Sequence, residues 1–455
     1  MLHMPFGRDH SWIRHASGAS RILRNAFWVA AWTIITLLFT ATLDLRTIGH
    51  AAERDAAANA APPGYTIVDG DILIRDRDLT DFIQGTYDVN LWTNGIVPYL
   101  FTTNDGTAVD SLTRTDISFV AGNPPEIRCV NCDFLDKYFS AGEEVLVSGS
   151  ASNDNSAGNG YTITGVVATA LTLSPGDPII NEAAGSTVTV ISTRSVTPVN
   201  QGLMITAMTE WEGVANVDFV AWTSQTNYIN IHNYTGNSSS LGMQGSQQFV
   251  RIKIWTPNNY TKHHELGHAL GFYHEHSRPD RDSFVQVNLI NVVGGSFNIN
   301  FRRADLISVT ADAYPIGTGV AVYDFDSVMH YGQCQASTCN NCSATPATCR
   351  TITVLPPNDI VWQNAIGQRT HLSTWDKRVM SFLYPENNWV FLHASSTAGS
   401  PNGGFVTPYT VWSTAYTAVP SNGRLIIIYP DTYSAAGTYS KAMTIEAPVG
   451  GVVLQ

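Results

Sequence analysis

The segment at residues 264–274, His-Glu-Leu-Gly-His-Ala-Leu-Gly-Phe-Tyr-His, restricts what this 455-residue chain can fold into more than any other segment. On a helix, His264 and His268 lie four residues apart on one face, so both imidazoles can reach the same metal ion. Glu265 lies beside that face, where it can hold a metal-bound water without binding the metal itself.

The second half of this segment supplies a third ligand. Gly271 can adopt the positive φ that ends a helix and turns the chain sharply. The turn brings His274 back toward the first two histidines. Three neutral nitrogens and an open position suit a catalytic zinc site, because the bound water then has a pKa of about 7. We therefore expect one zinc ion per chain; the alternative is a surface helix that happens to carry three histidines.

A second pattern, Ser-Val-Met-His-Tyr at residues 327–331, follows the zinc motif. Alone, Met329 would be an ordinary core residue. Together with the zinc motif, the pentapeptide resembles the Met-turn of the metzincins, in which a methionine lies beneath the metal site.

The run from His264 to Asp282 resembles the extended signature of the astacins, a metzincin family of secreted zinc endopeptidases. The resemblance covers residues 83–103 and 199–387. Further segments similar to astacin landmarks are Trp92–Tyr99, Tyr323–Phe325, Ile366–Arg369 and Leu372–Asp376.

The resemblance implies an α+β fold, a metzincin zinc protease of two subdomains with a mixed five-stranded sheet and a long active-site helix. We expect strands at 96–101, 217–222, 228–232 and 249–255, an edge strand within 241–250, and helices at 203–212, 261–270 and 373–384. The edge strand would bind a substrate backbone by strand addition.

The resemblance also implies roles for single residues. His264, His268 and His274 would bind zinc, and Glu265 would act as general base and then as general acid. Tyr331 would be an extra zinc ligand at rest and would stabilise the oxyanion during turnover. Its alternative role is that of a half-buried turn aromatic. Glu275, directly after the third histidine, would meet the amino terminus of the mature protein.

The stretch Ile-Val-Asp-Gly-Asp-Ile-Leu at residues 67–73 is similar to the astacin propeptide motif that ends in Gly-Asp. Asp71 would then be the inhibitory ligand that occupies the open position on zinc. Val68 stands where the family has an aromatic residue. Gly-Asp is also a common turn pair, so an ordinary turn is the alternative.

The chain departs from the family by an insertion and by its cysteines. Residues 104–198 contain short β-like runs, which predict an inserted all-β domain. The family has a cysteine shortly before the zinc helix, whereas the segment Lys253–Tyr260 of this chain contains none. Cys129 and Cys132 form one group, and four cysteines crowd a loop between residues 334 and 349. Either group could hold zinc, but local disulfides are expected because the cysteines of exported chains are normally oxidised. The loop disulfides would brace the lower subdomain.

The two ends of the chain differ from the protease. Four arginines, an uncharged run from Ala26 to Leu43 and small residues near Gly49 predict a secretory signal. An uncleaved signal anchor is the alternative. Beyond residue 387, the sequence resembles the opening coil of secreted β-helix proteins. The expected division is: 1–51 signal peptide or anchor; 52–82 propeptide; 83–103 and 199–387 catalytic domain; 104–198 inserted β domain; 388–455 small C-terminal β module.

Composition limits the partners. The formal net charge is −12, so binding to a phosphate backbone is not expected. The resemblance implies a secreted zinc endopeptidase, made as a latent precursor, that acts on protein or peptide substrates. After signal removal no stable membrane insertion is expected; retention of the anchor would tether the protein to a membrane. The alternative function is a catalytically silent adhesion or matrix-binding protein with a metzincin scaffold. The oligomeric state stays open.

Overall fold

The computed structural model describes residues 61–455, apart from 63, 69, 79–89, 103–107, 136, 138, 140, 157–159, 235, 296–298, 302, 304–322, 340–341, 345 and 449. The expected signal segment and the expected mature end near residue 83 lie outside the described residues. Within the described residues, no helix combines the length and the apolarity that crossing a bilayer requires.

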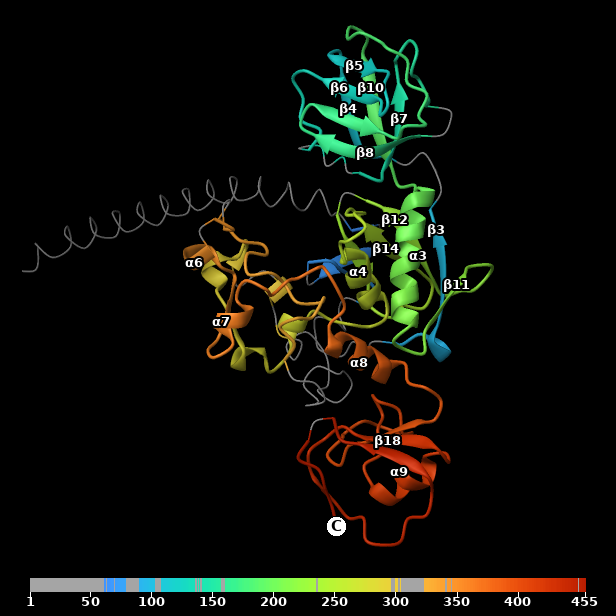
Figure 1. Ribbon diagram of the computed structural model, residues 1–455, viewed down its shortest axis with the longest axis vertical. Helices are drawn as coiled ribbons and strands as arrows, with labels where there is room; N and C mark the ends of the chain where they lie inside the picture. The colour runs from blue at the N-terminus through green and yellow to red at the C-terminus, as the bar shows by residue number, and fades with distance from the viewer. Residues whose placement is uncertain are drawn as a thin grey trace, which may run out of the picture. The chain divides into compact units, whose positions relative to one another are not determined.

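The metal-binding segment belongs to a mixed sheet and the helices beside it (Figure 1). Five strands lie in the order β11-β3-β12-β14-β13; all neighbours are parallel except β13, which is antiparallel to β14. This agrees with the expected mixed five-stranded sheet. The strands are β3 (Ile96–Phe101), β11 (Asp218–Ala221), β12 (Tyr228–Asn233), β13 (Ser238–Ser240) and β14 (Gln247–Ile252).

Two further strands extend this sheet to seven. β1 (Tyr65–Val68) and β2 (Ile72–Arg75) form an antiparallel hairpin, and β2 pairs in parallel with β13. The hairpin comes from the segment expected to be a propeptide. The expected edge strand at 241–250 is wrong: the strand that lies between β14 and the hairpin is β13 at 238–240, and β14 begins only at Gln247. Three consecutive serines show no apolar alternation, so nothing in that segment indicates a strand.

Three helices pack on the core of this region. They are α3 (Pro198–Glu212), α4 (Thr261–Ala269) and α8 (Thr374–Leu383). Ser373 caps α8 in a capping box with Asp376, which explains why the helix starts there. Buried residues such as Trp211, Ile231 and Leu266 join the helices and the sheet in one hydrophobic cluster.

The polypeptide between α4 and α8 contains mostly short elements, as expected for the lower subdomain. They are 3₁₀ turns η2 (Glu275–Ser277), η3 (Arg281–Ser283), η4 (Leu289–Asn291) and η6 (Ile299–Phe301), strands β15 (Val285–Val287) and β16 (Ile352–Val354), and helices α6 (Pro346–Cys349) and α7 (Asp359–Trp362). A further 3₁₀ turn, η1 (Thr93–Gly95), precedes β3. β15 and β16 pair antiparallel.

All six cysteines form local disulfides, as expected: Cys129–Cys132, Cys334–Cys342 and Cys339–Cys349. The last two lie in the loop that joins the Met-turn to β16.

The insertion forms its own antiparallel sheet, in the order β4-β10-β7-β8-β9-β6-β5, around its own hydrophobic cluster. Its strands are β4 (Ala108–Arg114), β5 (Ile117–Val120), β6 (Glu126–Cys129), β7 (Glu144–Ser148), β8 (Tyr161–Val167), β9 (Ala170–Leu173) and β10 (Val188–Thr193). The last four match the β-like runs in the sequence closely, because each run is rich in β-formers and is bounded by Gly, Asn or Pro.

The C-terminal region contains three parallel strands in the order β17-β18-β20. Parallel pairing of successive strands is compatible with stacked coils. The elements are β17 (Trp389–Leu392), α9 (Trp412–Ala418), β18 (Gly423–Ile427), β19 (Thr432–Tyr433), β20 (Met443–Glu446) and β21 (Val453–Leu454).

Candidate metal centre

Helix α4 and the turn after it bring the three histidines together. The Nε2 atom of His264 lies 3.2 Å from Nε2 of His268 and 3.2 Å from Nε2 of His274. Gly271 has a φ of 114°, a conformation that few other residues adopt, and this turn carries the chain back to His274. The three histidines therefore meet as the sequence predicts.

Backbone carbonyls orient two of the imidazoles. His264 Nδ1 lies 2.8 Å from the carbonyl oxygen of Val328, and His268 Nδ1 lies 2.6 Å from that of Phe272. A proton on each Nδ1 donates to these oxygens and leaves the Nε2 lone pairs for a metal. Burial lowers the pKa of both His264 and His268, which favours the neutral form that binds metals.

The carboxylate of Asp71 lies among the three imidazoles. Its oxygens are 3.3 Å from His264 Nε2, 3.5 Å from His268 Nε2 and 3.1 Å from His274 Nε2. Burial alone would raise the pKa of Asp71, but the charge of His274 and hydrogen bonds with the imidazoles bring it well below its usual value. The carboxylate is therefore the charged partner of this cluster.

These four residues fit one zinc ion. One ligand atom from each of Asp71, His264, His268 and His274 lies within 4.8 Å of the others. Three imidazole nitrogens and one carboxylate oxygen form a donor set that zinc prefers in four-coordinate sites.

Glu265 lies beside the histidine cluster and is buried, 1% exposed. Its Oε2 atom has no hydrogen-bond partner among the residues that the structure describes. Burial and the negative charge of Asp71 raise the pKa of Glu265 well above its usual value. The positive charges of Arg369 and Arg251 oppose that shift. A raised pKa makes the ionised carboxylate a stronger base, which suits a group that accepts a proton and later returns it.

The Met-turn lies against the zinc helix. A Cβ atom added at Gly267 would come within 2.8 Å of Met329 Sδ, so the methionine packs directly under α4. Tyr331 is 3% exposed, and its ring centroid lies 4.4 Å from that of His274. A Cβ at Gly70 would clash with the hydroxyl of Tyr331, so this position before Asp71 accepts only glycine. The hairpin segment therefore reaches both the cluster and Tyr331.

Two site residues received no role from the sequence. The buried ring of His276 stacks on Tyr331 at 4.0 Å between centroids, and its Nε2 lies 3.0 Å from Asn300 O. Arg369, known from the sequence only as a landmark, donates to the carbonyls of His330 and Gln368 and lines the cavity beside Glu265. Both residues lie in sequence segments similar to astacin landmarks, which marked the segments as important. The spacing of residues along the sequence did not indicate which contacts His276 and Arg369 make.

Behind His274, the carboxyl groups of Glu275, Asp324 and Asp376 lie close together, and the last two are buried. Glu275 Oε1 accepts from Asp324 N at 2.8 Å and from Arg278 Nη1 at 3.1 Å. Asp376 accepts from Val328 N at 2.9 Å. Burial, together with the charges of Asp376 and Glu275, raises the pKa of Asp324 to about 7. The expected meeting of Glu275 with a new amino terminus stays a prediction, because that terminus lies outside the described residues.

Asp324→Asn should make the free energy of unfolding less sensitive to pH. Between pH 3.8, the usual pKa of an aspartate, and about pH 7, Asp324 keeps its proton in the native protein but has lost it in the unfolded chain. Stability therefore falls as pH rises through this window, by about 1.4 kcal/mol for each unit by which the pKa is raised. We therefore expect the difference in free energy of unfolding, variant minus wild type, to be larger at pH 8 than at pH 5. Urea unfolding at both pH values measures this difference.

Asp218→Asn is the matched control, because Asp218 is exposed at the start of β11. It should leave the difference between pH 5 and pH 8 unchanged. An Asp324→Asn variant that follows the wild-type pH dependence would show that Asp324 keeps an ordinary pKa.

A helix with His-Glu-x-x-His, a third histidine after a glycine turn and a methionine beneath the metal site define a metzincin-type centre. Residues 184–385 match the model of the astacin peptidase family. The region that holds the metal centre is therefore an astacin-family domain.

Curated relatives agree with this assignment. The chain is 33% identical over 152 residues to zinc metalloproteinase nas-12 of Caenorhabditis elegans, covering 33% of this chain and 37% of the relative. It is 34% identical over 180 residues to high choriolytic enzyme 1 of Oryzias latipes, covering 39% and 58%. It is 30% identical over 226 residues to the astacin-like metalloendopeptidase of Mus musculus, covering 48% and 46%. The chain thus spans between 37% and 58% of the length of these relatives.

Two solved structures are also similar. The structure of high choriolytic enzyme 1, a hatching enzyme zinc-protease from Oryzias latipes, has 30% sequence identity and a TM-score of 0.34, covering 41% of this chain and 84% of that one. The structure of myroilysin has 22% identity and a TM-score of 0.30, covering 42% and 89%.

Proposed function

We propose that the protein is an exported, zinc-dependent endopeptidase that is made as a latent precursor and cleaves protein or peptide substrates. The observation that carries this proposal is the buried cluster of His264, His268 and His274 with Glu265 beside it. Membership of the astacin family and the zinc-protease relatives support it. The catalytic domain would comprise residues 83–103 and 199–387, interrupted by the insertion at 104–198.

Each residue has a role that its surroundings support. His264, His268 and His274 would hold zinc, which supplies a Lewis acid that polarises the scissile carbonyl and acidifies water. Glu265 would accept a proton from the attacking water and later donate it to the leaving amine, a role for which a raised pKa is suited.

Tyr331 would stabilise the oxyanion with its hydroxyl, since it lies next to His274 and is buried away from bulk water. The main chain of β13 would align the substrate. In the precursor, the amide of Ser239 donates to Asp71 O at 2.7 Å, and a substrate backbone would take over this position after the hairpin leaves.

Latency would follow from the prosegment. Asp71 would fill the open position on zinc, and the buried strand β2 would cover the substrate edge. Cleavage near Ile83 would remove this block. Export rests on the predicted signal at residues 1–51. If that signal is retained, it would tether the protein to a membrane.

Metal removal tests the proposal. Protein cleaved near Ile83 should contain one zinc ion and hydrolyse a quenched peptide library. A chelator should abolish hydrolysis and added zinc should restore it, because the proposed reaction depends on the ion that the three histidines hold. Zinc-loaded, folded and correctly cleaved protein that cuts no peptide would favour the alternative, a binding protein with a metzincin scaffold.

A further inference from the structure

A cavity of about 500 Å³ lies beside Glu265 and Tyr331. Gly70 and Asp71 of the hairpin segment line this cavity. The strand β2 follows them and pairs with β13, and its residues do not line the cavity. The cavity thus lies next to the metal cluster, and the hairpin borders it only through the two residues before β2. It has the size of a site for one or two substrate side chains.

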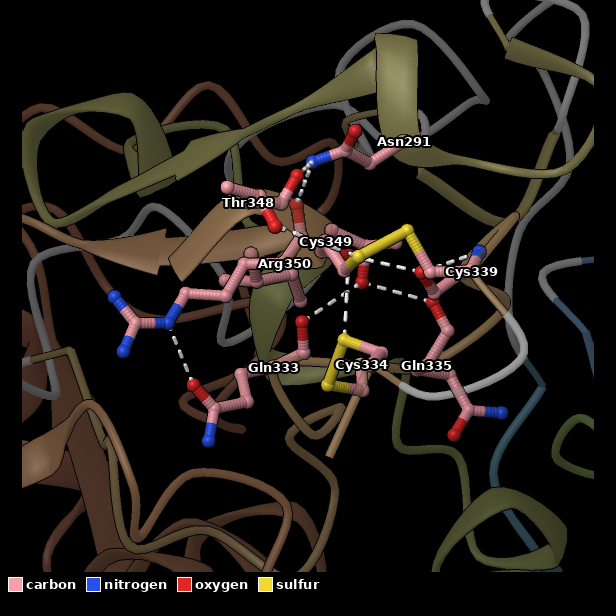
Figure 2. Close-up of a disulfide and its surroundings, with 12 residues drawn as sticks. Asn291, Gln333, Cys334, Gln335, Cys339, Thr348, Cys349 and Arg350 are labelled. Carbon is pink, nitrogen blue, oxygen red and sulfur yellow. Dashed lines mark hydrogen bonds between the residues drawn. A yellow bond between two sulfur atoms is a disulfide. The ribbon is translucent and has the colours of Figure 1, made fainter. Parts of the chain in front are cut away.

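One wall of this cavity comes from the disulfide-bridged loop between the Met-turn and β16. Gln335 and Ala336 line the cavity, and both belong to the segment that contains the two disulfides Cys334–Cys342 and Cys339–Cys349 (Figure 2). The astacin landmarks of the sequence do not include these cysteines. The cross-linked loop therefore forms part of the cavity wall.

The backbone of this wall is held on several sides. Thr351 Oγ1 donates to Gln335 O at 2.8 Å, and the amide of Val293 donates to Ala336 O at 2.9 Å. Arg350 Nε donates to Gln333 Oε1 at 2.8 Å, at the other side of the loop (Figure 2). The two cross-links and these hydrogen bonds together restrain the backbone around Gln335.

The side chain of Gln335, in contrast, is free to meet a ligand. Figure 2 shows it extending away from the two disulfides. It is exposed, and its side-chain amide has no hydrogen-bond partner within the part of the chain that the structure describes. Nearby in the lining, Asn259 Oδ1 accepts from the amide and hydroxyl of Thr261, which leaves the Asn259 amino group as a donor. The lining thus carries amide donors that can serve a ligand.

We propose that Gln335 is a specificity-determining residue, which donates a hydrogen bond to the terminal oxygen of a substrate side chain that enters this cavity. The disulfide-bridged loop holds it there. The preferred side chains end in an amide or a carboxylate, because an apolar side chain would leave the cavity donors unpaired. This inference rests on the proposed peptidase function.

The test uses the full-length protein activated by cleavage near Ile83, with peptides that differ only next to the cleaved bond. The kcat/KM ratio of glutamine to leucine peptides should fall about three- to tenfold in Gln335→Leu, the range for one hydrogen bond. Gln335→Ala should lower it in the same direction. Gln335→Glu should disfavour glutamate peptides relative to glutamine peptides by a similar factor, since two carboxylates would meet.

The matched control is Thr338→Ala, because Thr338 is exposed in the same loop and does not line the cavity. It should keep the wild-type profile. Replacing Cys339 and Cys349 by serine should weaken the preference while an alanine peptide is still cleaved. Zinc content is measured in every variant, so that a misfolded site is recognised.

Three outcomes decide the matter. A changed ratio in the Gln335 variants, with cleavage of an alanine peptide unchanged, supports the inference. If the wild type and the Gln335 variants cut all peptides with the same profile, the inference about Gln335 is overturned, but the proposed peptidase function is not. A wild-type protein that holds zinc and cuts none of the peptides overturns the proposed function, and with it the inference.

Discussion

Glu265→Gln is expected to lower peptide hydrolysis by roughly 10²- to 10⁴-fold, the usual contribution of general acid–base catalysis. The zinc content should stay at one ion per chain, because Glu265 contributes no atom to the group of four ligand atoms. Glutamine keeps the shape of the side chain but cannot accept a proton at neutral pH. Zinc by metal analysis and hydrolysis of a quenched peptide, measured on the same cleaved sample, are the two readouts.

The control for this experiment is Glu210→Gln. Glu210 Oε2 lies 2.9 Å from Nε2 of His263, a residue of helix α4 outside the cluster. This variant introduces the same chemical change next to the same helix and should leave hydrolysis within a few-fold of the wild type. If Glu265→Gln retains full activity with its zinc, another residue must be the general base.

Asp71→Ala should make the uncut precursor active. The carboxylate of Asp71 lies 3.1–3.5 Å from three imidazole nitrogens, so its removal frees the open position of the metal centre. A hydrogen bond to a charged group contributes about 1.5–3 kcal/mol, which corresponds to a rise of roughly ten- to a hundredfold over the wild-type precursor. Activity should remain below that of the cleaved protein, because β2 still pairs with β13.

Asp76→Ala is the matched control in the same prosegment. Asp76 accepts from Thr66 Oγ1 at 2.8 Å on the exposed side of the hairpin, away from the cluster. Its precursor should remain as latent as the wild type. An Asp71→Ala precursor that stays fully latent, while the cleaved protein is active, would show that the hairpin alone causes latency and would reject the role given to Asp71.

The zinc motif and most of the catalytic sheet could be predicted from the sequence because their signals are local. The spacing of His264 and His268 places two ligands on one helix face, and a glycine that permits a positive φ places the third. The strands β3 and β7 to β10 could be predicted for the same reason, since a short run of β-formers between turn residues is a local pattern.

The position of β13, the strand beside the hairpin, was less predictable from the sequence. β13 consists of three serines and pairs because β14 and β2 lie on either side of it. No residue of β13 indicates a strand by itself, and the expected position was therefore several residues too late. Likewise, the β1–β2 hairpin could not be recognised as part of the catalytic sheet, because the residues of β13 that pair with β2 are more than 160 residues away in the sequence.

The chemistry of this protein can be read from its amino-acid order: three imidazoles, one glutamate and a tyrosine at spacings that few folds accommodate. The surroundings of these catalytic groups depend on how distant segments of the chain pack together. Packing places the carboxylate of Asp71 among the histidines, and it buries Glu265 where its pKa is raised. It also brings Gln335 to the wall of the cavity. Ligand spacing is encoded within one helix and one turn, whereas burial, charge neighbours and cavity walls arise only when distant segments pack together.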